Sequence, residues 1–192
     1  DIFIGRGADI NGHIVNNART VSTLDASNYD TTNIFFGNQT NADGSPIAGT
    51  SDSMFFLNYD GNITGSNKMA ASLNGGTTEF DGTVNFEEVT VASGATLGGN
   101  GTVNATNGVT VLSQGNLGAG NSIGTLNING NLTFSPNSTH TVEIDANGTT
   151  PGVNNDLTNV NGDTTFTSAM NNPVTVDVQG TPGAFTVGRQ YT

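Results

Sequence analysis

A repeated pattern of apolar, hydroxyl and glycine residues is the feature that most limits how this chain can fold. Residues 89–99 read VTVASGATLGG and residues 109–119 read VTVLSQGNLGA, a repeat of about 20 residues. The triplets GTV, GTV and GTL recur at similar intervals, at residues 82–84, 101–103 and 124–126. A unit this short cannot enclose a core of its own, so successive units must stack on one another.

Within each unit, apolar residues alternate with Thr, Asn or Ser. Residues 141–145 (TVEID) and 174–178 (VTVDV) show this period of two, which is typical of strands with one buried face. Residues 126–134 and 160–166 continue the series, each broken by an Asn-Gly or Gly-Asn step. The asparagines suit turns, because they tolerate a left-handed backbone, and they can form a ladder with their copies in neighbouring units.

Short strands, Gly/Asn turns and a unit of about 20 residues predict an all-β fold, a right-handed parallel β-helix in which each coil pairs with the next at about 4.8 Å. An antiparallel β-sandwich is the alternative, since Asn-Gly steps also form hairpins. We expect the apolar members of the alternating segments to point inward. These residues are Val89, Val91, Leu97, Val103, Val109, Val111, Leu117, Leu126, Ile128, Leu132, Phe134, Val142 and Ile144.

The first part of the chain lacks this repeat. We therefore divide the chain into residues 1–80, an irregular β-rich N-terminal region or cap with an exposed loop at residues 37–53, and residues 81–192, the β-helical repeat region. The loop is polar, contains Gly and Pro, and lies between two apolar blocks. It either joins two core strands or serves as a binding loop or end cap, because the terminal coil of a solenoid must hide an unpaired strand edge.

The charge balance narrows the classes of partner. Four Lys and Arg residues stand against 16 Asp and Glu residues, a formal net charge of −12. Nucleic acid and anionic membrane surfaces both need clustered cations, so we expect neither as a partner. No apolar run approaches the roughly 18 residues of a membrane-spanning helix, so we expect no direct membrane insertion of this segment. The absence of Cys excludes disulfides and thiolate metal sites.

The second region resembles a known repeat. It is similar to the passenger-associated repeat of bacterial autotransporters in four runs: GATLGGNGTV (94–103), VTV (109–111), GNLGAGNSIGTL (115–126) and NGNLTF (129–134). The resemblance covers residues 80–192 and does not extend to the first 75 or so residues. It implies a parallel β-helix that is exported through the outer membrane and forms a stalk at the cell surface. The chain stops within the pattern, which suggests a fragment or a processed subunit.

The same region contains a G-x-S-x-G at residues 120–124, the pattern that holds a nucleophilic serine in one hydrolase fold. That use needs a helix after the motif, with a His and an acid beside it. Here residues 125–129 have a strand pattern, and the two histidines, His13 and His140, lie in polar stretches. We predict that Ser122 belongs to a turn whose glycines serve the backbone.

The sequence predicts no metal site and no cofactor. Residues 98–102 (GGNGT) supply the glycines of a calcium-binding β-roll, but Val103 stands where the aspartate belongs. Four further acids are spaced one per strand or turn, as on a solvated edge: Asp145, Asp156, Asp163 and Asp177.

A polysaccharide-degrading β-helix enzyme is the enzymatic alternative, because this architecture carries lyases and hydrolases. Such sites pair two carboxylates about 5 to 10 Å apart, or acids with a cationic base. The chain offers Glu79, Glu87, Glu88 and Glu143, with Arg6, Arg19, Lys68 and Arg189. The adjacent Glu87 and Glu88 would point to opposite faces of a strand, and no cation lies in the repetitive core. We therefore expect no enzyme.

These patterns predict a non-enzymatic structural and adhesive protein, extracellular or at the bacterial cell surface, that forms a β-helical stalk segment of autotransporter type. The alternative is a subunit of an extracellular filament that polymerises by β-strand complementation. The expected partners are further copies of the chain, through terminal strand edges, and a surface glycan or a host or neighbouring cell.

Overall fold

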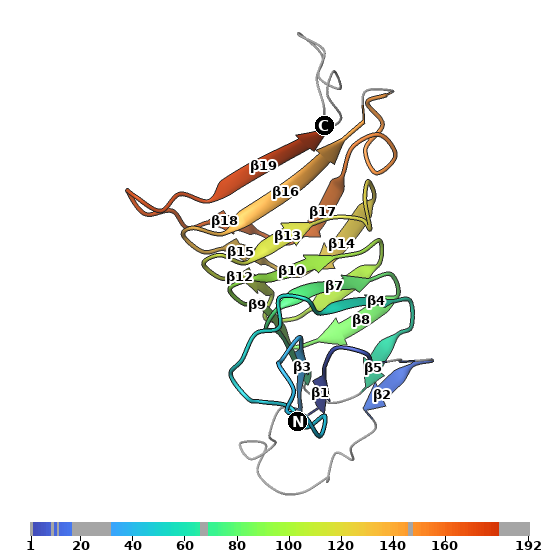
Figure 1. Ribbon diagram of the computed structural model, residues 1–192. Helices are drawn as coiled ribbons and strands as arrows, with labels where there is room; N and C mark the ends of the chain where they lie inside the picture. The colour runs from blue at the N-terminus through green and yellow to red at the C-terminus, as the bar shows by residue number, and fades with distance from the viewer. Residues whose placement is uncertain are drawn as a thin grey trace, which may run out of the picture.

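The structure is a computed structural model that describes residues 2–8, 10, 12–16, 32–65, 69–145 and 148–180. These residues form strands β1 to β19 in three sheets, stacked as successive coils (Figure 1). Every ladder between the strands is parallel. The predicted right-handed parallel β-helix is confirmed, and the antiparallel β-sandwich is wrong. The described residues include no helix of the length and apolar character that a membrane crossing needs.

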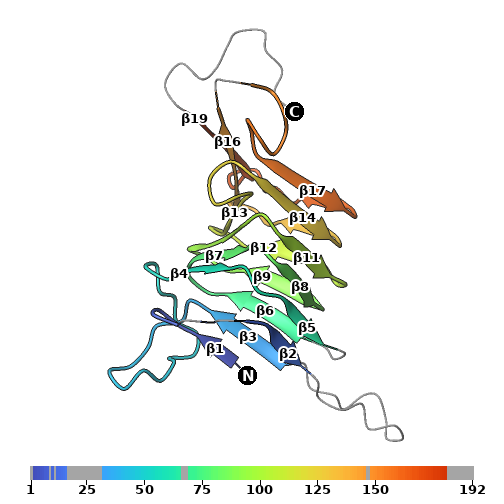
Figure 2. The ribbon, with the colours of Figure 1, turned by 90° about the vertical axis from the view of Figure 1, so that its right-hand side faces the viewer.

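The three sheets share one order of coils. Sheet 1 contains, in order, β1 (Ile2–Ile4), β3 (Thr32–Phe36), β6 (Met69–Leu73), β9 (Glu88–Val91), β12 (Val109–Val111), β15 (Leu132–Phe134) and β18 (Thr164–Phe166). Sheet 2 contains β4 (Phe56–Tyr59), β7 (Gly76–Phe80), β10 (Ala95–Gly98), β13 (Asn116–Gly118), β16 (Thr139–Ile144) and β19 (Thr175–Gly180). Sheet 3 contains β2 (Ile14–Asn16), β5 (Ile63–Gly65), β8 (Thr83–Phe86), β11 (Thr102–Ala105), β14 (Thr125–Asn129) and β17 (Leu157–Asn161). From β3 onward the chain visits sheets 1, 2 and 3 in turn, so three consecutive strands make one coil (Figure 2).

The strand register confirms the alignment of the two most similar repeats. Val89 pairs with Val109 and Leu97 pairs with Leu117, as the sequence alignment requires. The alignment of the GTV and GTL triplets holds for Val84 and Val103, which pair, but fails for the third triplet at residues 124–126. The residue opposite Val103 is Ile128, two positions beyond the Leu126 that ends the GTL triplet.

The interior of the coils is a continuous apolar core. All predicted inward residues are buried except Val142, which is only partly covered. Val142 lies in β16, next to β19, the last described strand of sheet 2. In β18 and β19 the side chains of Phe166, Val176 and Val178 are 53%, 54% and 48% exposed, because no described coil covers them.

One interior column of sheet 2 contains a polar residue among leucines. Leu57, Thr78, Leu97 and Leu117 occupy successive paired positions, and His140 follows them in β16. Thr78 is fully buried, and its Oγ1 has no hydrogen-bond partner.

The N-terminal region contributes strands to the same three sheets. Ile2 of β1 pairs with Ile34 of β3, and Ile34 pairs with Ala71 of β6. The chain between these partners is much longer than the chain between Val89 and Val109, so the first coils carry long insertions. One insertion is the loop at residues 37–53, which joins β3 of sheet 1 to β4 of sheet 2.

Asparagines form the predicted ladder on the outer face of sheet 3. The amide Nδ2 of Asn104 donates to Oδ1 of Asn85 at 2.6 Å, and Nδ2 of Asn129 donates to Oδ1 of Asn104 at 2.7 Å. These residues lie in strands rather than turns, at matching positions of three coils. Each amide thus ties one coil to the next, in addition to the main-chain ladder.

The turns between sheets 1 and 2 also stack. Gly94 and Gln114 have left-handed backbones, with φ of 76° and 63°. The amide of Gly94 donates to the carbonyl of Gln114 at 3.0 Å, and the amide of Gln114 donates to the carbonyl of Asn137 at 2.8 Å. The left-handed position recurs in three successive coils, at Gly94, Gln114 and Asn137, and Gly and Asn are the residues that adopt it most readily.

Candidate functional site

Ser122 lies in a turn between β13 and β14, and a strand follows it directly, as predicted. The two glycines of the motif are needed by the backbone. Gly120 has φ of 80°, in the left-handed region. A Cβ on Gly124 would lie 1.9 Å from Oδ1 of Asn100, which accepts the amide of Thr125. The residue spacing of the motif therefore follows from packing between coils.

The described contacts of the two histidines do not involve Ser122. His13 Nδ1 accepts the backbone amide of Asn62 at 2.9 Å. The ring of His140 packs on Phe134 with centroids 5.5 Å apart, and its Nε2 lies 3.2 Å from Oγ1 of Thr158. Burial lowers the pKa of His140 below its ordinary value. Both rings are thus placed as parts of the coil stack.

A pocket of about 670 Å³ lies beside the Ser122 turn. Its lining residues are Ser122, Ile123, Glu143, Ile144, Asp145, Gln179 and Gly180. Two carboxylates, Glu143 and Asp145, share this pocket, so the enzymatic alternative has a defined place in which it can be tested.

The prediction that the four acids from Asp145 to Asp177 form a solvated edge is wrong for Asp156, which is buried. Its side chain is only 8% exposed, and it accepts the backbone amides of Gly124 at 3.0 Å and Glu143 at 2.8 Å. Burial raises the pKa of Asp156 to about 6, against the two amide donors, which lower it. The long connection between β16 and β17 folds back and carries this carboxylate under the turn, which an even spacing of acids in the sequence does not reveal.

The loop at residues 37–53 is anchored to the coils by one buried amide. Asn38 is 1% exposed, and its Nδ2 donates to the carbonyls of Ile47 at 3.2 Å and Thr50 at 3.3 Å. Its Oδ1 accepts Nδ2 of Asn74 at 3.0 Å, from the coil that follows. Most other loop residues are exposed, so a fixed base carries an exposed surface.

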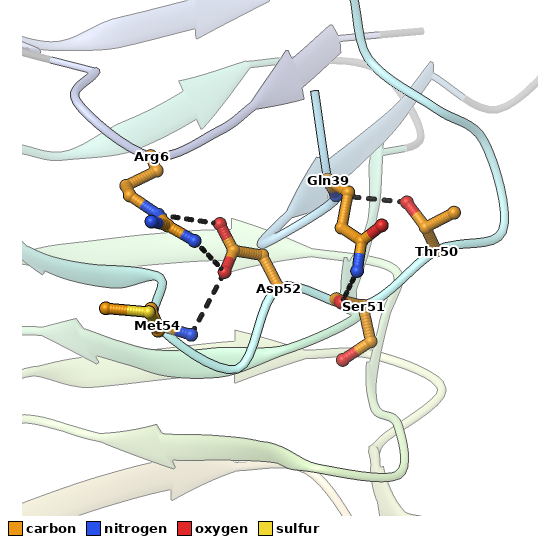
Figure 3. Close-up of polar contacts among 6 residues, drawn as sticks. All are labelled: Arg6, Gln39, Thr50, Ser51, Asp52 and Met54. Atoms are coloured by element: carbon orange, nitrogen blue, oxygen red, sulfur yellow. Dashed lines mark hydrogen bonds and ion pairs between the residues drawn. The ribbon is translucent and has the colours of Figure 1, made fainter. Parts of the chain in front are cut away.

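An ion pair joins the end of this loop to the first coil (Figure 3). Arg6 donates to Asp52 through Nε to Oδ2 at 2.9 Å and through Nη2 to Oδ1 at 2.6 Å. The amide of Met54 also donates to Asp52 Oδ1, at 3.0 Å. The hydrogen bond from Arg6 holds the pKa of Asp52 below its usual value. The bidentate geometry fixes the direction of the guanidinium as well as its position.

A second pocket, of about 420 Å³, lies at this ion pair and is lined by Arg6, Gln39, Thr40 and Asp52. Two hydrogen bonds of 3.0 Å hold Gln39 in place (Figure 3). Its backbone amide donates to Oγ1 of Thr50, and its side-chain Nε2 donates to the carbonyl of Ser51. The pocket offers guanidinium donors, a carboxylate, an amide and a hydroxyl, with the two charges already paired. Such a surface can exchange hydrogen bonds with a neutral, hydroxyl-rich ligand.

Sequence reasoning identified the loop but not this pocket. Nothing in the sequence distinguishes Arg6 from the other scattered cations, or Asp52 from the other acids. The two residues lie 46 positions apart, and no repeat connects them. The polar, Gly/Pro-containing character of the loop was the only sequence signal for the site.

In the described part of the chain, the adjacent glutamates and the calcium-motif residues are not assembled into a site. Glu87 lies between β8 and β9, at a corner of the coil, and Glu88 begins β9 and is exposed. Val103 is fully buried in the core, so the β-roll calcium motif is not formed. Among the described residues, no group of three or more His, Cys, Asp or Glu side chains could hold a metal ion. Arg19, Lys68 and Arg189 lie outside the described residues.

The chain is an all-β protein of the parallel β-helical class. Comparisons with protein-family models, with curated proteins and with solved structures found no match.

Proposed function

We propose that this chain is a non-enzymatic extracellular structural and adhesive protein, a β-helical stalk segment of autotransporter type at the bacterial cell surface. The observation that carries the proposal is the uninterrupted parallel stack, in which seven strands of sheet 1 follow one another from β1 to β18. A stack of coils acts as a spacer, because each coil contacts only its neighbours and adds about 4.8 Å of length. The resemblance of residues 80–192 to passenger repeats supports the same role.

The adhesive part of the proposal rests on the loop at residues 37–53. Its pocket at the Arg6 and Asp52 ion pair presents polar groups whose charges cancel, and Gln39 and Thr40 complete it. A neutral sugar matches this chemistry better than a charged polymer does, since the net charge of −12 repels anions and the carboxylate already has a cation. The proposed ligand class is a surface glycan of a host or neighbouring cell.

A glycan array and a cell-binding assay test the adhesive role. We expect the intact chain to bind one class of neutral glycan, and deletion of residues 37–53 to abolish binding. Thr40→Ala removes a pocket hydroxyl and should weaken binding by about tenfold, the loss of one good hydrogen bond. The control is Thr110→Ala, on the outer face of sheet 1, which should bind normally. Binding that survives the loop deletion, or equal losses in both Thr variants, would contradict the adhesive site.

The cell-surface location has its own test. In intact bacteria that produce the protein, an added protease should cleave it, since a surface stalk is accessible from outside. Complete protection in intact cells, with cleavage after lysis, would contradict the proposed location.

Filament formation is the second candidate, and the exposed apolar side chains of the last described strands favour it. The side chains of Val176 and Val178 in β19 and of Phe166 in β18 are about half exposed, at inward positions that a further coil would cover. A neighbouring molecule could supply that coil through its own first strands. Size-exclusion chromatography and negative-stain imaging separate the two candidates. Regular filaments would favour the polymer, and a discrete monomer would favour the stalk segment.

The enzymatic alternative is tested on the pocket beside Ser122. Turnover of any member of a polysaccharide panel that is lost in both Glu143→Gln and Asp145→Asn would overturn the non-enzymatic proposal. We expect no turnover by the intact chain.

A further inference from the structure

Glu79 is a buried carboxylate that the coil stack alone does not explain. It lies in β7 between Thr78 and Phe80, both fully buried in the interior, so its side chain points to the outer face of sheet 2. Even so, Glu79 is only 8% exposed, and its Oε2 is shielded from solvent without a hydrogen-bond partner. An ionised carboxylate is costly to bury unpaired, so a proton or a cation must neutralise it.

The surroundings of Glu79 depend on a glycine in the next coil. Glu79 pairs with Gly98 of β10. A Cβ on Gly98 would lie 3.3 Å from Cγ of Glu79, 3.2 Å from the carbonyl oxygen of Gly118 and 3.3 Å from that of Gly120. A side chain at position 98 would crowd all three atoms, so the glycine lets the Glu79 side chain and the two carbonyl oxygens lie close around one point.

A second carboxylate lies two residues further along the chain. Asp81 Oδ1 accepts the amide of Asn100 at 2.8 Å, and its Oδ2 accepts Nδ2 of Asn121 at 2.9 Å. Burial raises the pKa of Asp81, but the amide donors outweigh burial and hold its pKa below the ordinary value. For Glu79, burial and the charge of Asp81 both raise the pKa. The negative charge of Asp81 thus acts on the Glu79 carboxylate, so the two groups lie near each other.

The turn after β13 closes this site from the far side. Asn121 reaches Asp81 from a position 40 residues later in the chain, and the amide of Gly99 donates to the carbonyl of Gly120 at 3.0 Å. The turn therefore folds back over the end of β10 and brings its carbonyls toward Glu79. A carbonyl oxygen with one donor keeps a second lone pair for another partner.

We propose that Glu79 and Asp81, with the carbonyl oxygens of Gly118 and Gly120, bind a divalent cation of the calcium type. Calcium takes carboxylate and backbone carbonyl oxygens in flexible arrangements and completes its shell with water, whereas magnesium demands a regular octahedron and gives up water reluctantly. No described side chain supplies the positive charge instead. Arg6 is the only Lys or Arg in the described ranges, and it is bound to Asp52.

The test compares calcium binding by the chelator-stripped chain and by two variants that each lose one negative charge. Glu79→Gln removes the buried carboxylate. The matched control Glu88→Gln removes an exposed carboxylate, at the start of β9, and corrects for general attraction of cations to an acidic chain. Isothermal titration calorimetry and thermal unfolding followed by circular dichroism, with calcium and separately with magnesium, give the readouts.

The intact chain and Glu88→Gln should bind calcium with a dissociation constant of about 10⁻⁴ to 10⁻³ M, typical of extracellular sites with few charged ligands, and should unfold at a higher temperature when calcium is added. Magnesium should give a smaller shift. Glu79→Gln should lose the calcium effect, while unfolding at a temperature equal to or above that of the calcium-free intact chain, because an unpaired buried charge is gone.

Three results would overturn the proposal. The first is no calcium-dependent change in the intact chain at about 10 mM calcium, well above the expected dissociation constant. The second is an equal calcium effect in Glu79→Gln and Glu88→Gln. The third is a carboxyl carbon NMR signal showing that Glu79 is protonated at neutral pH and stays so when calcium is added, in which case a proton neutralises the site.

Discussion

The backbone amide of Gly124 donates to Oδ1 of Asp156 at 3.0 Å, across 32 residues of chain. The same carboxylate accepts the amide of Glu143, so it joins the Ser122 turn to β16 and to the start of β17. The Ser122 turn matches a catalytic motif in sequence, but these hydrogen bonds give it a structural role, since they connect it to the next coil.

Asp156 should make stability depend on pH in the direction opposite to that of most carboxylates. Its folded pKa of about 6 exceeds the ordinary value of 3.8, so the folded chain keeps a proton that the unfolded chain releases. That contribution is fully present below the unfolded pKa and is lost as pH rises through about 6. Relative to Asp156→Asn, the intact chain should lose about 1 to 2 kcal/mol between about pH 4 and pH 7.5, after allowance for solvent screening. Urea unfolding of both proteins at both pH values measures this loss. An intact chain that gains stability relative to Asp156→Asn as pH rises would contradict the prediction.

Substitutions in the G-x-S-x-G turn should show whether its residues serve the backbone conformation or a catalytic reaction. Gly124→Ala should destabilise the chain by about 2 kcal/mol or more, because the new Cβ would lie 2.7 Å from the backbone Cα of Gly120 and would also meet Oδ1 of Asn100. Ser122→Ala should change stability by less than about 0.5 kcal/mol, since Ser122 is exposed. Thermal unfolding of both variants is the measurement. A large loss in Ser122→Ala with a neutral Gly124→Ala would contradict the turn interpretation.

Thr78→Val should stabilise the protein. The hydroxyl of Thr78 is fully buried without a partner, in a column with Leu57 and Leu97, and Val has nearly the same shape. Removing an unsatisfied hydroxyl should raise the free energy of unfolding by about 1 kcal/mol. Thr90→Val, on the outer face of sheet 1, is the control and should change it by less than about 0.5 kcal/mol. Equal effects at the two positions would show that the Thr78 hydroxyl has a partner.

His140 should make the chain sensitive to acid. Burial lowers its folded pKa, so as pH falls below the ordinary value of 6.5 the unfolded chain takes up a proton first. The stability that neutral His140 provides is therefore present at higher pH and is lost as pH falls. His140→Leu, which continues the leucine column, should lose less stability than the intact chain between about pH 7.5 and pH 5. An equal loss in the variant would place the acid sensitivity elsewhere.

The repeat in the sequence was sufficient to predict the architecture of the middle coils. The pairing of Val89 with Val109 follows directly from the alignment of the two segments, because both have the same strand and turn lengths. The register beyond them was off by two residues, since Ile128 rather than Leu126 lies opposite Val103. A period-two pattern fits either position, so alternation alone cannot fix which apolar residue faces which.

The first coils were harder to predict because insertions hide the period. Ile34 pairs with Ala71, and the loop at residues 37–53 accounts for much of the chain between them. The candidate site depends on the same insertion, since it brings Asp52 beside Arg6. The burial of Glu79 could not be predicted for a different reason. An outward position on a strand normally predicts exposure, and the turn that covers Glu79 comes from two coils later.

Engineered cysteine pairs test the stacking of the coils most directly, because the chain has no cysteine of its own. Thr90 pairs with Thr110, and Thr110 pairs with Thr133, on three successive strands of sheet 1. Cysteines at positions 90 and 110 would lie about 4.8 Å apart and should cross-link on mild oxidation, whereas cysteines at 90 and 133 would lie about twice as far apart and should not. Mass spectrometry of peptides from both double variants identifies the bond. Efficient cross-linking of the first pair alone is the predicted result, and cross-linking of the second pair with none in the first would contradict the parallel stack of coils.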